Sequence, residues 1–186
     1  MANREDDDPM TEINGITIRD AEEKDRDAIL ALMLESYGQY EKVMPGDGWL
    51  QYAESIRESV DREGPVARII AELDGEIVGS VQMFTSSETA YGAPELGIVT
   101  PIIRLLATSP KARGKGVATA LIKESARRAI ELGSDTLHLH TSDMMESAVR
   151  LYERLGFERA YDKEMQKGEV LVKCYRLLLK ETALLS

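Results

Sequence analysis

The sequence predicts an α/β fold of the α+β type, in which helices flank a mixed β-sheet. Three observations support this prediction: two apolar-rich runs that flank a tight-turn dipeptide, an apolar run that leads into a glycine-rich turn, and amphipathic stretches that end at glycine. In chain order they give a strand, two helices, an antiparallel hairpin, two strand–helix units and a final hairpin. Strands and helices interleaved in this way pack as a sheet with helices on its faces.

The first third of the chain is expected to contain a short strand and two helices. Residues 16–19 alternate apolar and polar side chains, as a strand does. Apolar residues then recur at helical spacing from Ile29 to Ser36, after an acidic stretch that suits a helix N-terminus. A loop over 38–48 separates this helix from a second one, whose apolar positions are Trp49, Ala53, Ile56 and Val60.

A β-hairpin is predicted over 67–84. Its centre is Asp74-Gly75, a dipeptide favoured at tight turns because both residues tolerate a positive φ. Residues 85–100 are expected to form an irregular connection, since serine, glycine and proline are frequent there. The next segment, 102–108, is apolar except for one arginine, which is typical of a strand buried on both faces.

The last third of the chain alternates strands and helices. A helix with one apolar and one charged stripe begins near Ala118 and is capped by Gly133, and a strand over 136–141 follows. The next helix ends at Gly156.

The start of this later helix and the end of the chain complete the predicted order of elements. Asp143 and Glu146 have the spacing of a capping box at the helix start. Residues 157–165 and 170–179 are predicted to be the two strands of a hairpin.

Composition and charge limit the classes of function. The 186 residues, without repeat or linker, predict a single domain over 13–186, after a disordered acidic tail over 1–12. The net charge of −10 argues against a nucleic-acid partner, because such binding depends on Lys and Arg at phosphates. The sequence contains no signal peptide and no apolar run of membrane-spanning length, so we expect a cytoplasmic protein without a membrane partner.

A glycine-rich turn over 109–118 joins a buried strand to a helix N-terminus. Backbone N–H groups at such a terminus suit phosphate, glycines let an anion approach them, and Arg113 and Lys115 add charge. A P-loop would need glycine at the place of Ser109, and a dinucleotide fingerprint would need glycine or alanine at the place of Thr119. A solvent-exposed turn without a ligand is the remaining alternative from the loop alone.

Two motifs resemble signatures of the GNAT superfamily of N-acetyltransferases. Residues 113–118 match its Arg/Gln-x-x-Gly-x-Gly/Ala pattern, and residues 106–110 are similar to the strand and bulge that precede it. Residues 148–157 are similar to the second signature, Ala-x-x-Leu-Tyr-x-x-x-Gly-Phe. The strong match covers 105–157, and the order of elements fits the superfamily over about 16–180.

The resemblance implies a GNAT fold, a cosubstrate and a site. It implies a mostly antiparallel sheet in which two splayed parallel strands, 103–108 and 136–141, hold acetyl-CoA. It assigns Tyr152 as the general acid for the leaving thiolate, since an unperturbed phenol has a pKa of about 10; a tyrosine that merely packs in the core is the alternative. The residues that it assigns to acetyl-CoA are Leu106, Ala107, Thr108, Arg113, Gly114, Lys115, Gly116, Val117, Ala118 and Thr119.

The sequence departs from the superfamily pattern at two positions. Many members have asparagine where Met145 stands, and that side chain contacts the cofactor arm; Ser142 or Asp143 could make the contact instead. Many members also have a glutamate that acts as base where Ile102 stands. The general base is therefore unassigned, and its candidates are Glu95, Asp143 and His140.

Three further sets of residues have competing interpretations. Cys174 lies in an apolar run and is expected to be a buried thiol rather than a nucleophile. His138 and His140 alternate on one strand without a third ligand, so we expect no metal site. One aromatic group either shapes an acceptor pocket or simply packs: Tyr37, Tyr40, Trp49, Tyr52 and Tyr91.

The resemblance implies an acetyl-CoA-dependent N-acetyltransferase that acts on a primary amine by direct attack. The sequence leaves the acceptor open among polyamines, amino acids, aminoglycosides, peptide N-termini and protein lysines. A homodimer is common in the superfamily. The alternative function is a non-catalytic acetyl-CoA-binding sensor or assembly module, because the asparagine and the glutamate are missing. A nucleotide-binding oxidoreductase would need the dinucleotide fingerprint that the loop does not complete.

Overall fold

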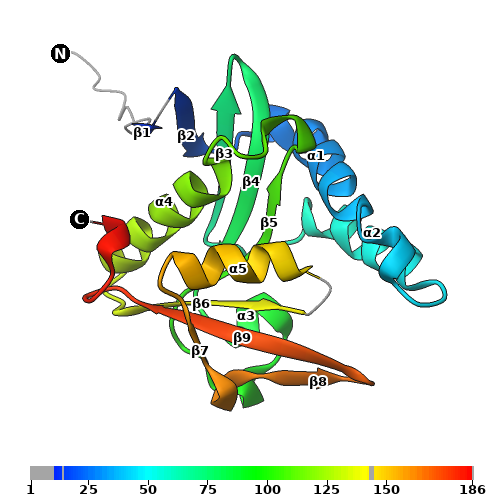
Figure 1. Ribbon diagram of the computed structural model, residues 1–186, viewed down its shortest axis with the longest axis vertical. Coiled ribbons are helices and arrows are strands. Elements are labelled where there is room, and N and C mark those ends of the chain that lie inside the picture. The colour runs from blue at the N-terminus through cyan, green and yellow to red at the C-terminus, as the bar shows by residue number, and fades with distance from the viewer. Residues whose placement is uncertain (1–10, 14, 143–144, 186) are drawn as a thin grey trace.

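Nine strands of the described chain form a mixed sheet (Figure 1). The computed structural model describes residues 11–13, 15–142 and 145–185. The order across the sheet is β1-β2-β3-β4-β5-β6-β9-β7, and β8 pairs with the first residues of β9. The strands are β1 (Thr11–Ile13), β2 (Ile16–Asp20), β3 (Ala67–Leu73), β4 (Glu76–Phe84), β5 (Ile102–Thr108), β6 (Thr136–Thr141), β7 (Glu158–Arg159), β8 (Met165–Lys167) and β9 (Val170–Leu178).

The pairing of β5 with β6 is parallel, whereas the other strand pairs are antiparallel. This pattern confirms the predicted mixed, mostly antiparallel sheet. Pairing joins Ile102 to His138 and Ile103 to Leu139 and stops there, so the two strands diverge beyond these residues. Figure 1 shows the result: β3, β4 and β5 run steeply, while β6 and β9 cross the view below them and α5 lies between.

Helices cover both faces of the sheet. One face is covered by α1 (Arg26–Gly38) and α2 (Gly48–Ser59), and its buried core consists of Ile29, Leu32, Met33, Tyr37, Ile56, Ile70 and Ala107. The other face is covered by α4 (Val117–Glu131) and α5 (Glu146–Arg154), whose buried residues belong to a larger core that also includes Ile69 and Ala71 of β3. Consecutive residues of β3 thus pack in the cores on opposite faces of the sheet, because side chains alternate along a strand.

The predicted hairpin and its turn are confirmed. β3 and β4 pair antiparallel from Ala67 with Met83 to Leu73 with Glu76. Asp74 and Gly75 connect them with φ values of 52° and 79°. Two positive φ angles in a two-residue loop give the turn whose twist matches that of the strands.

Two expected segment boundaries are corrected by the strands. Thr11 and Glu12, which we assigned to a disordered tail, belong to β1 and pair with Ile18 and Thr17 of β2; residues 1–10 lie outside the described part of the chain. The single strand expected over 157–165 is divided, because a 3-10 turn at Tyr161–Lys163 separates β7 from β8. The two short strands pair with different parts of β9.

Two further expectations concern helices. The connection over 85–100 is not irregular throughout, because Ser87–Tyr91 form the helix α3. Its N-terminus is capped by Ser86, whose hydroxyl accepts a hydrogen bond from the Thr89 N–H at 3.2 Å, and its C-terminus ends at Gly92 with φ 62°. The capping residue expected for α5, Asp143, lies outside the described residues; the N-cap is Met145.

The N-terminus of α4 approaches β4 at Gly79, where a side chain does not fit. A Cβ atom at this position would lie 2.5 Å from Cγ1 of Val117 and 2.9 Å from Cδ1 of Leu121. Val117 is the first residue of α4. Because Gly79 has no side chain, the start of α4 and the loop before it can lie close to the sheet.

We expect Gly79→Ala to lower the free energy of unfolding by about 1–3 kcal/mol, the usual cost of an extra methyl in a packed core. Gly38→Ala is the matched control, because a Cβ there would lie 3.7 Å and 3.8 Å from two ring atoms of Trp49, which are ordinary contact distances. Denaturant-induced unfolding measures both variants. Equal stability of Gly79→Ala and Gly38→Ala would contradict the prediction.

Candidate active site

A cleft of about 450 Å³ opens where β5 and β6 diverge. Both strands contribute to its walls, and so do residues from the two faces of the sheet: Tyr37 and Tyr52 come from α1 and α2, and Tyr152 comes from α5. Its lining is mostly apolar with a few polar groups, and its size and character are those of a small-molecule site.

A β-bulge forms the β5 wall of this cleft. Ala107 pairs with Ser80, but the next pair is Arg104 with Gln82, so Leu105 and Leu106 together stand opposite one residue of β4. Leu105 has a φ of 55°, which is uncommon for a residue other than glycine. The bulge turns this part of the backbone away from the ladder with β4, as bulges beside active sites do. The Leu106 carbonyl accepts a hydrogen bond from the Tyr37 hydroxyl at 2.8 Å.

The glycine-rich turn lies between β5 and the N-terminus of α4. Gly114 and Gly116 have φ values of 77° and 82°, and Gly116 is the N-cap of the helix. No described side chain caps this terminus. A Cβ atom on either glycine would meet nothing within 4 Å, so the space before the helix start is open. Unpaired N–H groups facing open space, with Arg113 and Lys115 exposed beside them, can bind an anion such as a phosphate.

Tyr152 is buried beside the cleft. Its side chain is 8% exposed and lines the cleft, and its ring centroid lies 5.8 Å from that of Phe157. Burial, with smaller contributions from Tyr40 and Tyr52, raises the pKa of the Tyr152 phenol above its usual value. The group therefore keeps its proton well above neutral pH and can act as a proton donor.

His140 of β6 and Tyr91 of α3 form a hydrogen-bonded pair in the cleft. Tyr91 Oη lies 2.9 Å from His140 Nδ1, and His140 Nε2 lies 2.9 Å from the Lys163 carbonyl oxygen. Burial lowers the pKa of His140, so the ring is neutral at pH 7. Because a carbonyl oxygen only accepts, Nε2 carries the proton, and Nδ1 accepts a hydrogen bond from the Tyr91 hydroxyl. The pair can accept one further proton.

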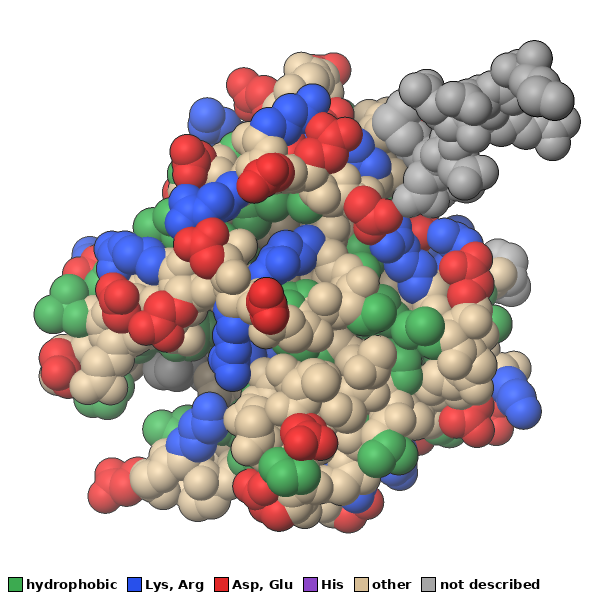
Figure 2. Space-filling model, turned by 180° about the vertical axis from the view of Figure 1, so that it is seen from behind, with side chains coloured by type: hydrophobic (Ala, Val, Ile, Leu, Met, Phe, Trp, Pro, Cys, Tyr) green, Lys and Arg blue, Asp and Glu red, His purple; other side chains and the backbone are tan. Residues whose placement is uncertain are grey.

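Two cations stand in the cleft, Arg104 and Lys167. Nη1 of Arg104 donates to the Ala90 carbonyl at 2.6 Å, and its guanidinium lies 4.7 Å from the centroid of the Tyr91 ring. The part of the lining that the structure describes includes no carboxylate. In the space-filling view, basic side chains gather at the edge of a hollow between α2 and the segment around β8 (Figure 2).

The structure brings some of the expected site residues together and leaves others apart. Leu106, Ser142, Met145 and Tyr152 line the cleft. Ala107 is 1% exposed and packs in the core beneath α1 instead. The remaining expected residues continue from the end of β5 through the glycine-rich turn into α4: Thr108, Arg113, Gly114, Lys115, Gly116, Val117, Ala118 and Thr119.

Among the three candidates for a general base, the structure places His140 in the cleft. Glu95 lines a different pocket, and Asp143 lies outside the described residues. Ile102, the position at which the resemblance led us to look for a glutamate, is fully buried with Phe84, so a charged base is not accommodated there. The hydrogen bond between Tyr91 and His140 and the two cations of the cleft have no signal in the local sequence, because they bring together segments far apart in the chain.

Cys174 is confirmed as a buried thiol. It is 0% exposed, and burial raises its pKa to about 12. Among the described residues, no group of three or more His, Cys, Asp or Glu side chains could hold a metal ion. None of the described helices is long and apolar enough to cross a membrane.

Comparison with known proteins agrees with this geometry. A model of the acetyltransferase (GNAT) family matches residues 27–157. An uncharacterised N-acetyltransferase of Methanocaldococcus jannaschii is 27% identical over 84% of this chain and 65% of its own length. A probable N-acetyltransferase of Mus musculus is 31% identical over 48% of this chain and 37% of its own length. The chain thus spans less than two thirds of the length of these curated relatives.

Solved structures share the fold at low sequence identity. A GNAT-family protein of Desulfovibrio desulfuricans superposes with a TM-score of 0.68 at 20% identity, over 88% of this chain and 99% of its own. A protein of Salmonella typhimurium solved with acetyl-CoA has a TM-score of 0.58 at 18% identity, over 91% and 96%. A spermidine N-acetyltransferase chimera derived in part from Vibrio cholerae has a TM-score of 0.59 at 18% identity, over 90% and 97%.

Proposed function

Because this chain belongs to the acetyltransferase (GNAT) family, we propose that it transfers an acetyl group from acetyl-CoA to a primary amine by direct attack. One observation carries the proposal. The sheet opens between β5 and β6 beside a bulge, and the strand with the bulge leads into an uncapped helix N-terminus. A ligand with a thioester at one end and phosphates further along matches both features.

The residues of the glycine-rich turn suit the pyrophosphate of acetyl-CoA. The open N-terminus of α4 supplies backbone N–H groups, and its helix dipole favours negative charge. Arg113 and Lys115 are exposed beside it and add positive charge. The pantetheine arm would bind backbone groups of Leu106, which the bulge takes out of the pairing with β4, and of Thr108, which still pairs with Gly79.

The side chains of the cleft supply both proton transfers of the reaction. The amine nitrogen forms a bond to the thioester carbonyl carbon, and the carbon–sulfur bond then breaks. Tyr152 gives its proton to the leaving thiolate. The nitrogen loses its proton to the Tyr91 hydroxyl, which passes its own to His140 Nδ1. Exchange of one proton with water restores both groups, and the products are an amide and free CoA thiol.

The charges of the cleft favour an acceptor that carries a carboxylate near its amine. Arg104 and Lys167 would repel a polyamine or an aminoglycoside, and the described lining offers no carboxylate to compensate. An amino acid or a peptide N-terminus near an acidic side chain brings the missing negative charge. These acceptors are therefore preferred among the classes that the sequence left open.

Calorimetry and a thiol-release assay test the proposed function. We expect acetyl-CoA to bind with micromolar affinity and NADH, the control ligand, to show no binding. Amino acids and acidic peptides should then release CoA thiol faster than spermidine does. Absence of acetyl-CoA binding would refute the proposal. Binding without thiol release on any amine would instead favour a non-catalytic acetyl-CoA sensor.

The pair of His140 and Tyr91 leads to a prediction about pH. The base must be neutral to accept a proton, and burial lowers its pKa below the ordinary 6.5, so the rate should persist as pH falls through 6.5 and decline only below it. We expect His140→Gln to lower kcat about 100-fold and to remove this acid limb. The matched control is His138→Gln, two residues earlier on the same strand face and outside the cleft. An unchanged pH profile in His140→Gln would exclude this base.

A further inference from the structure

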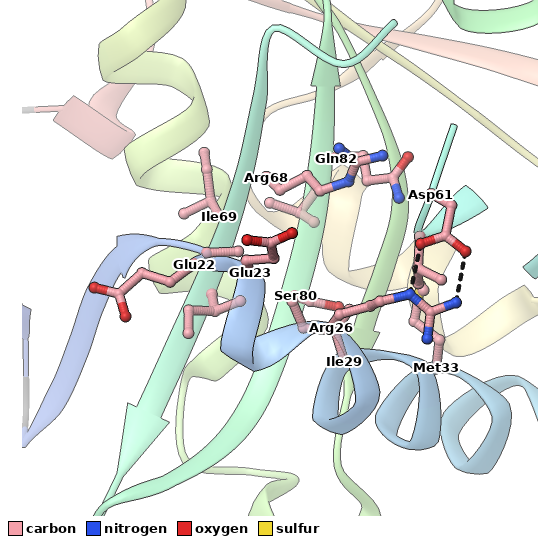
Figure 3. Close-up of a pocket in the computed structure, with 14 residues that line it drawn as sticks. Glu22, Glu23, Arg26, Ile29, Met33, Asp61, Arg68, Ile69, Ser80 and Gln82 are labelled. Carbon is pink, nitrogen blue, oxygen red and sulfur yellow. Dashed lines mark hydrogen bonds and ion pairs between the residues drawn. The ribbon is translucent and has the colours of Figure 1, made fainter. Parts of the chain in front are cut away.

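A second pocket, of about 320 Å³, lies on the face of the sheet that α1 and α2 cover (Figure 3). It is bounded by the first turns of α1, the end of α2, and strands β3 and β4. Its lining residues and those of the cleft are two separate sets among the described residues. Its volume is at the lower end of the range for small-molecule sites.

The floor of this pocket is polar, although it belongs to the face of a sheet. Arg68 of β3 stands opposite Gln82 of β4, and Ser80 is two residues before Gln82 on the same face. Part of this set has a structural role at the end of α2. Nη2 of Arg68 donates to the Ser59 and Arg62 carbonyls at 3.0 Å and 2.6 Å, and Gln82 Nε2 donates to the Ser59 carbonyl at 3.1 Å.

Two hydrogen-bond donors of the floor remain without a partner in the described protein. They are Nε of Arg68 and the hydroxyl of Ser80, and both atoms are buried. Ser80 is 4% exposed and lines the pocket, as Figure 3 shows. Buried donors are rarely left unpaired, because desolvation without a hydrogen bond is costly. Asp61 interacts electrostatically with Arg68, but its carboxylate is hydrogen-bonded by Arg26. The floor therefore offers two donors and a positive charge to a ligand oxygen.

The mouth of the pocket has the opposite character. Glu23 lies on one side of it, beside Glu22, whose carboxylate pairs with Lys24 at 3.0 Å. On the other side Arg26 binds Asp61 through two contacts of 2.5 Å, drawn as dashed lines in Figure 3, so these two charges neutralise each other. A ligand that entered would thus find positive charge at the bottom and negative charge at the entrance.

We propose that this pocket binds a small apolar amino acid. Its carboxylate would accept hydrogen bonds from Arg68 Nε and Ser80 Oγ, and its ammonium group would face Glu23. Its side chain would pack on the apolar part of the wall, which includes Ile29, Met33, Val60 and Ile70. A carboxylate alone would be repelled by the acidic entrance, and an amine alone would face the cation at the floor. A zwitterion satisfies both ends.

Calorimetric titration of the full chain with L-leucine, without acetyl-CoA, tests the proposal. Two probes of the same shape each lack one charge: 4-methylpentanoate has no amine, and 3-methylbutylamine has no carboxylate. We expect L-leucine to bind and each probe to bind at least about tenfold more weakly, since a hydrogen-bonded charge is worth about that factor. No heat from L-leucine, or equal affinity for 4-methylpentanoate, would overturn the proposal.

The substitution Ser80→Ala tests whether L-leucine binds in this pocket. Its hydroxyl has no protein partner, so we expect the melting temperature to stay unchanged while the affinity for L-leucine falls about tenfold. Ser125→Ala is the control at a buried serine of α4, whose hydroxyl bonds the Leu121 carbonyl at 2.8 Å, and it should leave the affinity unchanged. Affinity that survives in Ser80→Ala but is lost in Arg104→Met would place L-leucine in the cleft instead. That outcome would overturn this inference and support the proposed acceptor class.

Discussion

Replacing Gly116 with glutamate is expected to weaken acetyl-CoA binding by at least about 100-fold. A side chain at this position would extend into the open space before α4, and its carboxylate would occupy the place of the pyrophosphate at the helix N-terminus. Repulsion between this carboxylate and the phosphates adds to the steric conflict. Calorimetric titration with acetyl-CoA measures the loss.

The same helix provides a matched control for this substitution. Gly133 follows the other end of α4 with a φ of 83°, close to the 82° of Gly116, and a Cβ atom there would also meet nothing within 4 Å. Gly133→Glu thus has the same charge and a similar backbone strain of about 1–2 kcal/mol. We expect similar melting temperatures for the two variants and normal acetyl-CoA binding by Gly133→Glu. Equal affinities would show that the turn does not hold the pyrophosphate.

Tyr152→Phe is expected to lower kcat by about 100- to 10,000-fold, the range for loss of a general acid. The affinity for acetyl-CoA should remain, because the ring still fills the same space beside Phe157. Tyr175→Phe is the control, at a tyrosine that is 3% exposed and outside the cleft. Steady-state kinetics with a responsive amine measures both variants. A Tyr152→Phe enzyme within threefold of the wild type would rule out this acid.

The raised pKa of Tyr152 also predicts the alkaline side of the pH profile. The acid must be protonated to act, so activity is present below its pKa and is lost as pH rises through it. Because burial raises this pKa above the usual 10, the wild-type kcat should not decline before pH 10. A decline that begins near neutral pH would point to another acid.

Local patterns were sufficient to predict most elements of the fold. The strand at 102–108 and the strand at 136–141 were predicted with the bounds that β5 and β6 have. The first is an apolar run interrupted by Arg104, and the second alternates leucine with polar residues. The division of 157–165 into β7 and β8 was not predicted. It depends on pairing with two parts of β9, which no pattern within the segment records.

The candidate site was predictable where it rests on short motifs and unpredictable where it rests on long-range contacts. The glycine-rich turn and Tyr152 carry recognisable spacing in the sequence. The bond between Tyr91 and His140 joins residues 49 positions apart, and Arg104 reaches the cleft from a strand predicted to be simply buried. The floor of the second pocket combines Arg68 and Ser80 from two strands. Each of these side chains looks ordinary in its own segment.

The burial of Cys174 has a practical consequence for kinetic work on this protein. The chain has one cysteine, and a thiol that is 0% exposed with its pKa raised to about 12 is neither accessible nor ionised at neutral pH. Aromatic disulfide reagents, which change colour when a thiolate attacks them, should therefore leave the folded protein unlabelled. The colour that develops during turnover then measures the CoA thiol that is released. The activity of the native chain can therefore be followed continuously, and no cysteine-free variant is needed.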